Sequence, residues 1–257
     1  MAQIVTSFED RPEGRIARVV IDNAAKLNVL NSALSAELEA AFRALAGEPN
    51  LRAAVLSGAG DRAMIGGADI REMAGLTPAT ARSFITQLHN VCHAIRALPV
   101  PVIARMRGYT LGGGLEVAAA CDMRIASDDA VMGMPEVRVG IPSVIEAALL
   151  PQLIGWGRTR RILLTGENFD ARKALEWGMV EEVVPAAELD AAIDRVLADV
   201  LAGAPHALAL QKRLILEWEE RGMAGAIAAG IDAFAEAWTT PEPAARMRHF
   251  LESKRRA

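Results

Sequence analysis

Glycines and glutamates are the residues of this chain whose types and spacing are best suited to chemistry. Glycines 112–114 lead directly into Glu116, and a second glutamate, Glu136, follows in the tripeptide Met-Pro-Glu. Another glycine-rich element, Gly-Gly-Ala-Asp, occupies residues 66–69. Glycine lets backbone N–H groups approach a ligand oxygen closely, and carboxylates can give and take protons beside that oxygen. The pattern therefore predicts proton transfer next to a polarised oxygen.

Each glycine element stands where a strand is expected to end and a helix to begin. Helical turns are predicted at residues 69–73 and 115–120. The first N–H groups of a helix have no partner within it and lie at the positive end of the helix dipole. If the two junctions face each other, two amides form an oxyanion hole, in which loss of one donor costs about 3 kcal/mol of barrier. Glycines before a helix also serve close packing alone, and that alternative stays open.

The two glutamates have surroundings that suit a division of acid and base work. Glu116 is flanked by Leu115, Val117 and a run of alanines, which predicts burial. A buried carboxylate is costly unless it is paired or has a raised pKa. Pro135 favours an extended Met134 and so orients the loop that carries Glu136. The alternative is that both are structural acids that cap a helix or pair with an arginine.

A further glycine motif has a different interpretation. Residues 58–63 fit G-x-G-x-x-A, a pattern typical of dinucleotide-binding loops. The glycines at 66 and 67 would break the helix that this loop must open, and the acidic residue expected about 20 positions later is missing. We therefore interpret residues 58–63 as a plain loop. The chain also lacks a Walker-type phosphate loop.

Composition excludes several classes of function. The 257 residues carry a net charge of −4, which gives no general attraction for nucleic acid or anionic membranes. Cys92 and Cys121 have no CxxC partner, so we expect two reduced core thiols in a cytoplasmic protein. No uncharged apolar run is long enough to span a membrane, and the first 14 residues do not read as a secretory signal.

Hydrophobic periodicity predicts an α/β core followed by a helical extension. Strands are expected at residues 4–8, 16–21, 51–56, 100–106, 123–126, 130–132 and 179–184, and helices at 33–45, 80–98, 190–201, 207–218, 224–238 and 244–253. The tail is strongly apolar between residues 223 and 238. That face either packs on its own domain or is buried against sister subunits.

Five stretches in order resemble the crotonase (enoyl-CoA hydratase/isomerase) superfamily, and among its members the chain is most like the enoyl-CoA hydratases. They are KLNVLNSAL (26–34), AVLSGAGDRAMIGGADIREM (54–73), PVIARMRGYTLGGGLEVAAACDMRIAS (101–127), MPEVRVGI (134–141) and LLTGENFDARKALEWGMVEEVVP (163–185). The resemblance implies a spiral core of repeated ββα turns over residues 1–195. It also implies a helical region over residues 196–257 that builds trimers, often stacked in pairs.

The same resemblance implies a set of site residues for an acyl-CoA thioester. The oxyanion hole would be the backbone N–H groups of Ala68 and Gly113, and the two hydratase acids would be Glu116 and Glu136. Coenzyme A would be bound near four residues of two loops, namely Lys26, Leu27, Gly66 and Ile70.

The implied activity is hydration of 2-enoyl-CoA to 3-hydroxyacyl-CoA in fatty acid metabolism, without metal and with no cofactor beyond the coenzyme A of the substrate. We expect Glu116 to activate water and Glu136 to manage the C2 proton. The alternatives are another reaction of the superfamily, namely double-bond isomerisation, thioester hydrolysis or decarboxylation, or a non-catalytic binding member. Both glutamates being present favours hydration, and the acidic balance argues against RNA binding.

One stretch departs from the superfamily pattern. Hydratases commonly have a glycine-rich GAGGT segment shortly after the second acid, whereas this chain has Pro-Ser-Val-Ile-Glu-Ala at residues 142–147. We expect this change to alter the wall of the acyl pocket and to add a carboxylate, Glu146. We expect both the acyl chain length that the protein accepts and the reaction that it catalyses to depend on this segment.

Overall fold

A six-stranded sheet forms the centre of the α/β body. The computed structural model describes residues 2–256. The sheet order is β1 (Gln3–Arg11), β2 (Gly14–Asp22), β3 (Leu51–Gly58), β5 (Val102–Met106), β7 (Met123–Ser127) and β10 (Glu182–Val184). The first two strands, both expected from the sequence, form an antiparallel hairpin, and the others pair in parallel.

A second, smaller sheet consists of three-residue strands. Its order is β4 (Ala63–Ile65), β6 (Tyr109–Leu111), β8 (Val131–Gly133) and β9 (Asn168–Asp170). The sequence predicted only β8, because three residues are too few to show alternation. From β3 to β8, strands of the first sheet alternate along the chain with strands of the second, and each pair is followed by a helix or 3₁₀ turn. The ββα turns expected from the resemblance are therefore confirmed.

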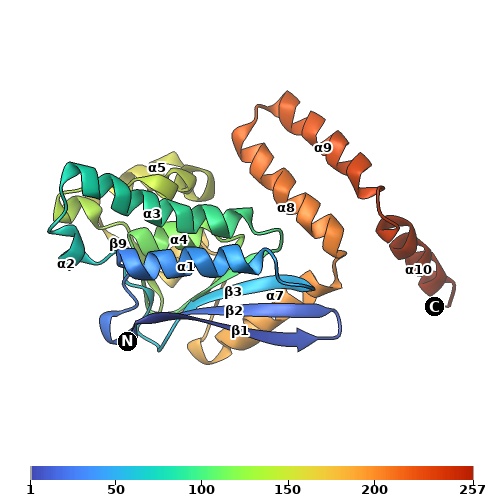
Figure 1. Cartoon of the computed structure of the whole chain (residues 1–257), viewed down its shortest axis with the longest axis horizontal. Coiled ribbons are helices and arrows are strands. Elements are labelled where there is room, and N and C mark those ends of the chain that lie inside the picture. Colours follow the sequence, from blue (N-terminus) through green and yellow to red (C-terminus); the bar gives the residue numbers. More distant parts are fainter. Residues whose placement is uncertain (1, 257) are drawn as a thin grey trace.

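Helices cover the sheets and fill the space between them (Figure 1). They are α1 (Ser32–Leu45), α2 (Ile70–Met73), α3 (Pro78–Ala97), α4 (Gly113–Ala120), α5 (Leu150–Thr165) and α6 (Ala171–Trp177), with 3₁₀ turns η1 (Ala24–Lys26), η2 (Glu136–Val139), η3 (Ile145–Leu149) and η4 (Ala186–Glu188). Asn31 caps α1, because its side chain accepts a hydrogen bond from the Leu34 amide at 2.8 Å. All eight residues of α4 are buried, which its glycines and alanines make possible.

The strand predicted at residues 179–184 is shorter than expected. Only Glu182–Val184 pair with β7, and Met179 and Val180 are instead buried in the main core. An apolar run does not separate a strand from an irregular segment that simply packs inward. The prediction was therefore wrong for the first half of this run.

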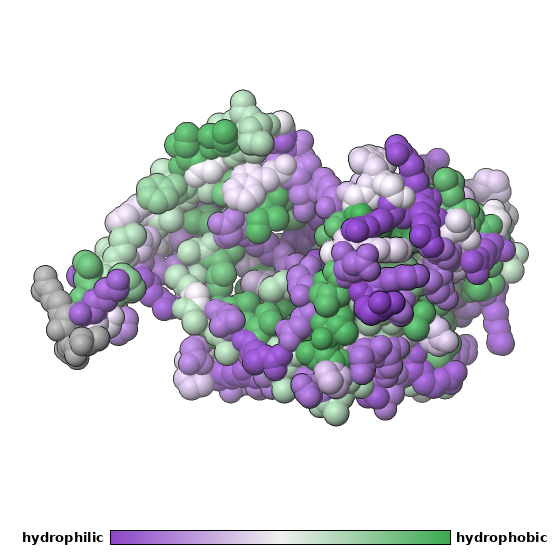
Figure 2. Space-filling model, turned by 180° about the vertical axis from the view of Figure 1, so that it is seen from behind, coloured by the Kyte–Doolittle hydropathy of each residue, from purple (hydrophilic) through white to green (hydrophobic). Residues whose placement is uncertain are grey.

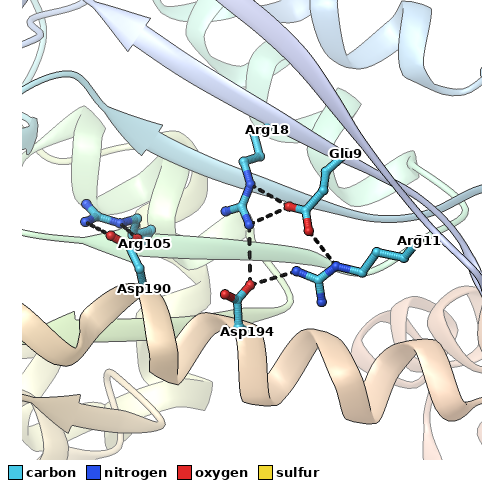
Figure 3. Close-up of polar contacts among 6 residues, drawn as sticks. All are labelled: Glu9, Arg11, Arg18, Arg105, Asp190 and Asp194. Atoms are coloured by element: carbon cyan, nitrogen blue, oxygen red, sulfur yellow. Dashed lines mark hydrogen bonds and ion pairs between the residues drawn. The ribbon is translucent and has the colours of Figure 1, made fainter.

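Helix α7 (Leu189–Ala202) packs on the opposite face of the large sheet. Its residues Leu189, Ile193 and Leu197 form a second apolar cluster with strand residues such as Ile103. Charged residues support this contact at the surface: Arg11 and Arg18 both reach Asp194, and Arg105 pairs with Asp190 (Figure 3). The division expected at residue 195 falls inside α7, so the segment that leaves the sheet begins after this helix.

The last three helices project from the α/β body as an arm (Figure 1). They are α8 (Pro205–Glu220), α9 (Met223–Ala237) and α10 (Glu242–Arg256). Five large apolar side chains of α9 and its C-cap are exposed at helical spacing: Met223, Ile227, Ile231, Phe234 and Trp238. Figure 2 shows hydrophobic residues gathered over this arm. We call these five residues the apolar stripe; the single chain does not bury it.

Lys212 fixes α8 to the body. Its buried ammonium group donates to the carbonyl oxygens of Ile95 and Val100 at 3.1 and 3.0 Å and to Asp122 Oδ2 at 2.8 Å. We expect Lys212→Met to lower the free energy of unfolding by about 2–4 kcal/mol, because Asp122 loses its cationic partner and two carbonyl oxygens each lose one donor. Denaturant unfolding measures this, with the exposed Lys254→Met as the matched control. A loss no larger than that of the control would contradict this role.

Candidate active site

A cavity of about 750 Å³ contains the residues that the sequence singled out. Both glycine elements line it, and so do Glu116 and Glu136. Phe84, Ile85 and Leu88 of α3 form an apolar wall. A second wall comes from residues 139–144, which include three of the residues that replace the glycine-rich segment. The cavity is therefore mostly apolar, with polar groups gathered at the two glycine elements.

The two glycine elements lie side by side. A Cβ added to Gly67 would lie 3.3 Å from the carbonyl oxygen of Leu111, in the strand that leads to the second element. Position 67 has φ +116°, which allows glycine and disfavours other residues. The preceding loop is held by pairing with residue 30, whose amide donates to Gly67 O at 2.9 Å. The two junctions that the sequence analysis considered together therefore lie next to each other in the structure.

The amides of Ala68 and Gly113 have no hydrogen-bond acceptor among residues 2–256, although both line the cavity. One neighbour of each is paired: the Asp69 amide donates to Leu30 O, and the Gly112 amide donates to Gly133 O, both at 2.8 Å. Gly113 is the first residue of α4, so its N–H lies at the positive end of a fully buried helix. The cavity thus has unpaired amides in both turns.

Both carboxylates lie against one pair of adjacent glycines. A Cβ on Gly112 would lie 2.5 Å from Glu136 Oε1, and a Cβ on Gly113 would lie 3.8 Å from Glu116 Oε2. Consecutive Cα atoms are about 3.8 Å apart, so both carboxyl groups lie near the same short stretch of main chain. The sequence predicted that they face one cavity, and the structure places them there.

Glu116 is buried on the first turn of α4. Its Oε1 accepts a hydrogen bond from the Ala147 amide at 3.1 Å. Burial and, after it, the nearby charge of Glu136 raise the pKa of Glu116 to about 8, although the Ala147 amide opposes the shift. Glu116 is therefore mostly protonated at neutral pH in the free protein.

Glu136 begins the turn η2 and is more accessible than Glu116. Burial also raises the pKa of Glu136, but its own amide and the Ser143 hydroxyl oppose the rise. Ser143 Oγ donates to Glu136 Oε2 at 2.9 Å. The two acids thus sit in unequal surroundings, a pattern typical of carboxyl pairs that share acid and base roles.

The residues expected to contact coenzyme A occupy one edge of the cavity and the loop behind it. Gly66 and Ile70 line the cavity, and Ile70 is exposed. Lys26 and Leu27 do not line it. They lie directly behind, because the Gly66 amide donates to Leu27 O at 2.8 Å. The structure thus brings all four to one place, with two at the surface of the cavity.

Sequence reasoning missed two polar partners of the acids. The Ala147 amide and the Ser143 hydroxyl both belong to the segment that replaces the glycine-rich stretch. A serine among apolar residues, seven positions after Glu136, was the available signal for the second. A backbone donor leaves no signal in residue types. Glu146, expected at the pocket wall, instead turns away from the cavity toward α3.

Three further observations concern metal ligands, cysteines and membrane-spanning helices. Within residues 2–256, no group of three or more His, Cys, Asp or Glu residues is placed to hold a metal ion. Cys92 and Cys121 are buried free thiols. No helix in the described chain is both long and apolar enough to cross a membrane.

Comparison with known proteins agrees with this geometry. The family model of enoyl-CoA hydratase/isomerase matches residues 11–256. A short-chain-enoyl-CoA hydratase of Clostridium acetobutylicum is 33% identical over 95% of this chain and 94% of its own length. A crotonyl-CoA hydratase of Syntrophomonas wolfei is 32% identical over 95% and 94% of the two chains.

Solved structures show the same arrangement. An enoyl-CoA hydratase from Bacillus anthracis superposes with a TM-score of 0.90 at 29% identity, over 96% of each chain. One from Mycobacterium smegmatis gives 0.91 at 28% identity, also over 96% of each. These matches confirm the fold that the five sequence stretches implied. The chain belongs to the enoyl-CoA hydratase/isomerase family and has the crotonase fold.

Proposed function

We propose that this protein hydrates 2-enoyl-CoA thioesters to 3-hydroxyacyl-CoA. The observation that carries the proposal is the meeting of two unpaired amides, Ala68 and Gly113, with two carboxyl groups in one apolar cavity. An apolar cavity suits an acyl chain, and two free donors suit an oxygen that gains charge. The names of the relatives support the same reaction.

The chemistry needs what the cavity offers. Water adds its oxygen to C3, the C2–C3 double bond opens, and negative charge moves to the thioester oxygen between the amides of Ala68 and Gly113. One carboxylate takes a proton from the water, and one carboxyl group gives a proton to C2 as the carbonyl re-forms. The pair ends with the charge it began with, so the reaction consumes no cofactor.

The two acids are assigned to these steps as expected from the sequence. We propose that Glu116 activates the water and Glu136 protonates C2. The resting proton of Glu116 must then pass to Glu136 through the bound water before attack. A base with a pKa near the working pH is well matched to this task.

The coenzyme A portion is assigned to the edge near α2. We propose that Gly66 and Ile70 contact the adenine portion, with Lys26 and Leu27 in the loop behind them. We further propose that the protein works in the cytoplasm, in fatty acid metabolism, where its thiols stay reduced.

A screen of acyl-CoA substrates tests the proposal. The purified protein is incubated with 2-enoyl-CoAs of increasing length and branching, and loss of the conjugated thioester absorbance is followed. Products are identified by mass, because hydration adds one water, isomerisation adds nothing, hydrolysis frees coenzyme A and decarboxylation loses CO₂. A gain of one water supports hydration. Any other product assigns the alternative reaction, and no turnover with tight RNA binding at physiological salt indicates a binding member.

Ser143 provides a test of the unequal acids. We expect Ser143→Ala to raise the pKa of Glu136, because the ionised carboxylate loses a hydrogen bond that the neutral form needs less. The acidic limb of the kcat/KM profile should move to higher pH, with activity about 3- to 10-fold lower at pH values below the midpoint of that limb and little changed near pH 9. An equal loss at every pH would indicate altered packing instead.

The apolar stripe supports an oligomer. We propose a trimer, alone or stacked in pairs, in which the stripe of α9 is buried between subunits. Ile231→Glu should give a smaller species in sedimentation velocity, because burying an unpaired carboxylate costs several kcal/mol. Ala228→Glu is the matched control, because this exposed position lies about 60° around the helix from Ile231 and about 100° from the centre of the stripe. Unchanged sedimentation of Ile231→Glu would remove the stripe from the interface.

A further inference from the structure

Glu146 is a further buried carboxylate, and it lies behind the site. It lies on η3, with 7% of the residue exposed, and does not line the cavity. Its Oε1 is 2.8 Å from Nδ1 of His89 on α3. Its Oε2 is buried and has no hydrogen-bond partner among residues 2–256. Burying a carboxylate that has only one hydrogen-bonded oxygen costs folding free energy. This cost points to a role for Glu146 beside the site.

Glu146 is linked to Glu116 by the backbone and by charge. The residue that follows it, Ala147, donates its amide to Glu116 Oε1 at 3.1 Å. Any shift of η3 therefore moves that donor. The negative charge of Glu146 also adds to the raised pKa of Glu116, after the larger effects of burial and of Glu136.

Few titratable groups face Glu146. From α3 these are His89 and the Cys92 thiol, and from α4 the group is Glu116. Burial, aided by Glu146, raises the pKa of Cys92 well above its usual value, so this thiol stays neutral. The α5 arginines with described contacts are engaged elsewhere: Arg158 with Trp177 O, Arg160 over the Trp156 ring and Arg161 with Glu167. His89, half exposed, is thus the group that connects Glu146 with solvent.

We propose that the His89–Glu146 pair positions Glu116 from behind: it fixes the turn whose amide binds Glu116 and places a second negative charge next to that carboxyl group. Both are positioning residues, because neither lines the cavity. The inference rests on the proposed function, which gives the proton of Glu116 its use. It adds that the segment replacing the glycine-rich stretch tunes the strength of the base as well as the shape of the pocket.

The direction of the effect follows from the charges. A negative Glu146 disfavours ionisation of Glu116, so removing that charge lowers the pKa of Glu116, and so does a permanent cation beside it. Removing the charge should weaken Glu116 as a base. A purely structural pair would change stability without moving this titration.

Infrared titration of the free protein tests the proposal without any substrate. From pH 6 to 10 nearly all of the 32 Asp and Glu side chains are ionised, so few protonated-carboxyl bands remain. The Glu116 band is identified by its loss in Glu116→Gln. We expect Glu146→Gln to lower its titration midpoint by about one pH unit. A missing Glu116 band in the unsubstituted protein would overturn this inference, whereas missing hydration would overturn only the proposed function.

A second variant tests the same inference without replacing a buried residue. His89→Lys places a fixed cation at a half-exposed position and should also lower the Glu116 midpoint. His93→Lys adds the same charge one turn along the same exposed face of α3 and is the matched control, expected to shift the midpoint much less. The inference is overturned if His89→Lys shifts the midpoint no more than His93→Lys, or if a folded Glu146→Gln leaves it unchanged.

Discussion

Glu116→Gln and Glu136→Gln should each lower kcat/KM for hydration of crotonyl-CoA by about 10²- to 10⁴-fold. Glutamine keeps the shape and hydrogen-bonding reach of each side chain but cannot exchange the proton. Among the described residues that line the cavity, these two are the only ones with a carboxyl group, so no other acid is placed to replace either of them. Steady-state rates followed at the conjugated thioester absorbance measure the loss, and the double substitution should cost little more than the worse single one.

Stability provides the control for these variants, and its sign can be worked out for Glu116. Its pKa is about 8 in the folded protein and near 4.5 in the unfolded chain. Between these values the folded state binds the extra proton, so the free energy of unfolding falls as pH rises through this window. Glu116→Gln removes that decline. The free energy of unfolding of the variant, measured against that of the unsubstituted protein, should therefore be more favourable at pH 9 than at pH 5. Full activity in either single variant would refute the assignment of the two acids.

Gly112→Ala should abolish most activity while leaving a folded protein. Gly112 has φ +53° and ψ −127°, a conformation that side chains disfavour, and its new Cβ would lie 2.5 Å from Glu136 Oε1. Either the Glu136 carboxylate must move, or the turn must open and shift the neighbouring Gly113 amide. A misplacement of about 1 Å can cost about 100-fold in rate, so either change is expected to remove most of the activity.

The matched control separates backbone strain from displacement of Glu136. Gly155 in α5 also has a disfavoured conformation, φ +79° and ψ 155°, but an added Cβ there meets nothing within 4 Å. We expect Gly155→Ala to lower stability by about 1–3 kcal/mol and to keep near-normal kcat/KM. Similar losses of activity in both variants would mean that strain alone disturbs the site. Thermal unfolding and steady-state rates together distinguish the outcomes.

Local sequence was sufficient for the parts of the fold with strong patterns. The β1–β2 hairpin, α1 with its Asn31 cap, and the long helix α3 follow from alternation, capping chemistry and helical periodicity. The three-residue strands β4, β6 and β9 exist because neighbouring strands complete their hydrogen bonds. Such pairing partners are set by tertiary contacts, so their strands leave little pattern of their own.

Within the site, residue types alone pointed to the glycine junctions and the two glutamates, since only glycine permits such close backbone approach and only acids or bases move protons. Contacts between distant segments decided the rest. Packing of η3 on α4 buries Glu116 and raises its pKa, and packing of η3 against α3 joins Glu146 to His89, 57 positions earlier. Burial and charge act through space, and the order of residues along the chain does not contain these distances until the chain has folded.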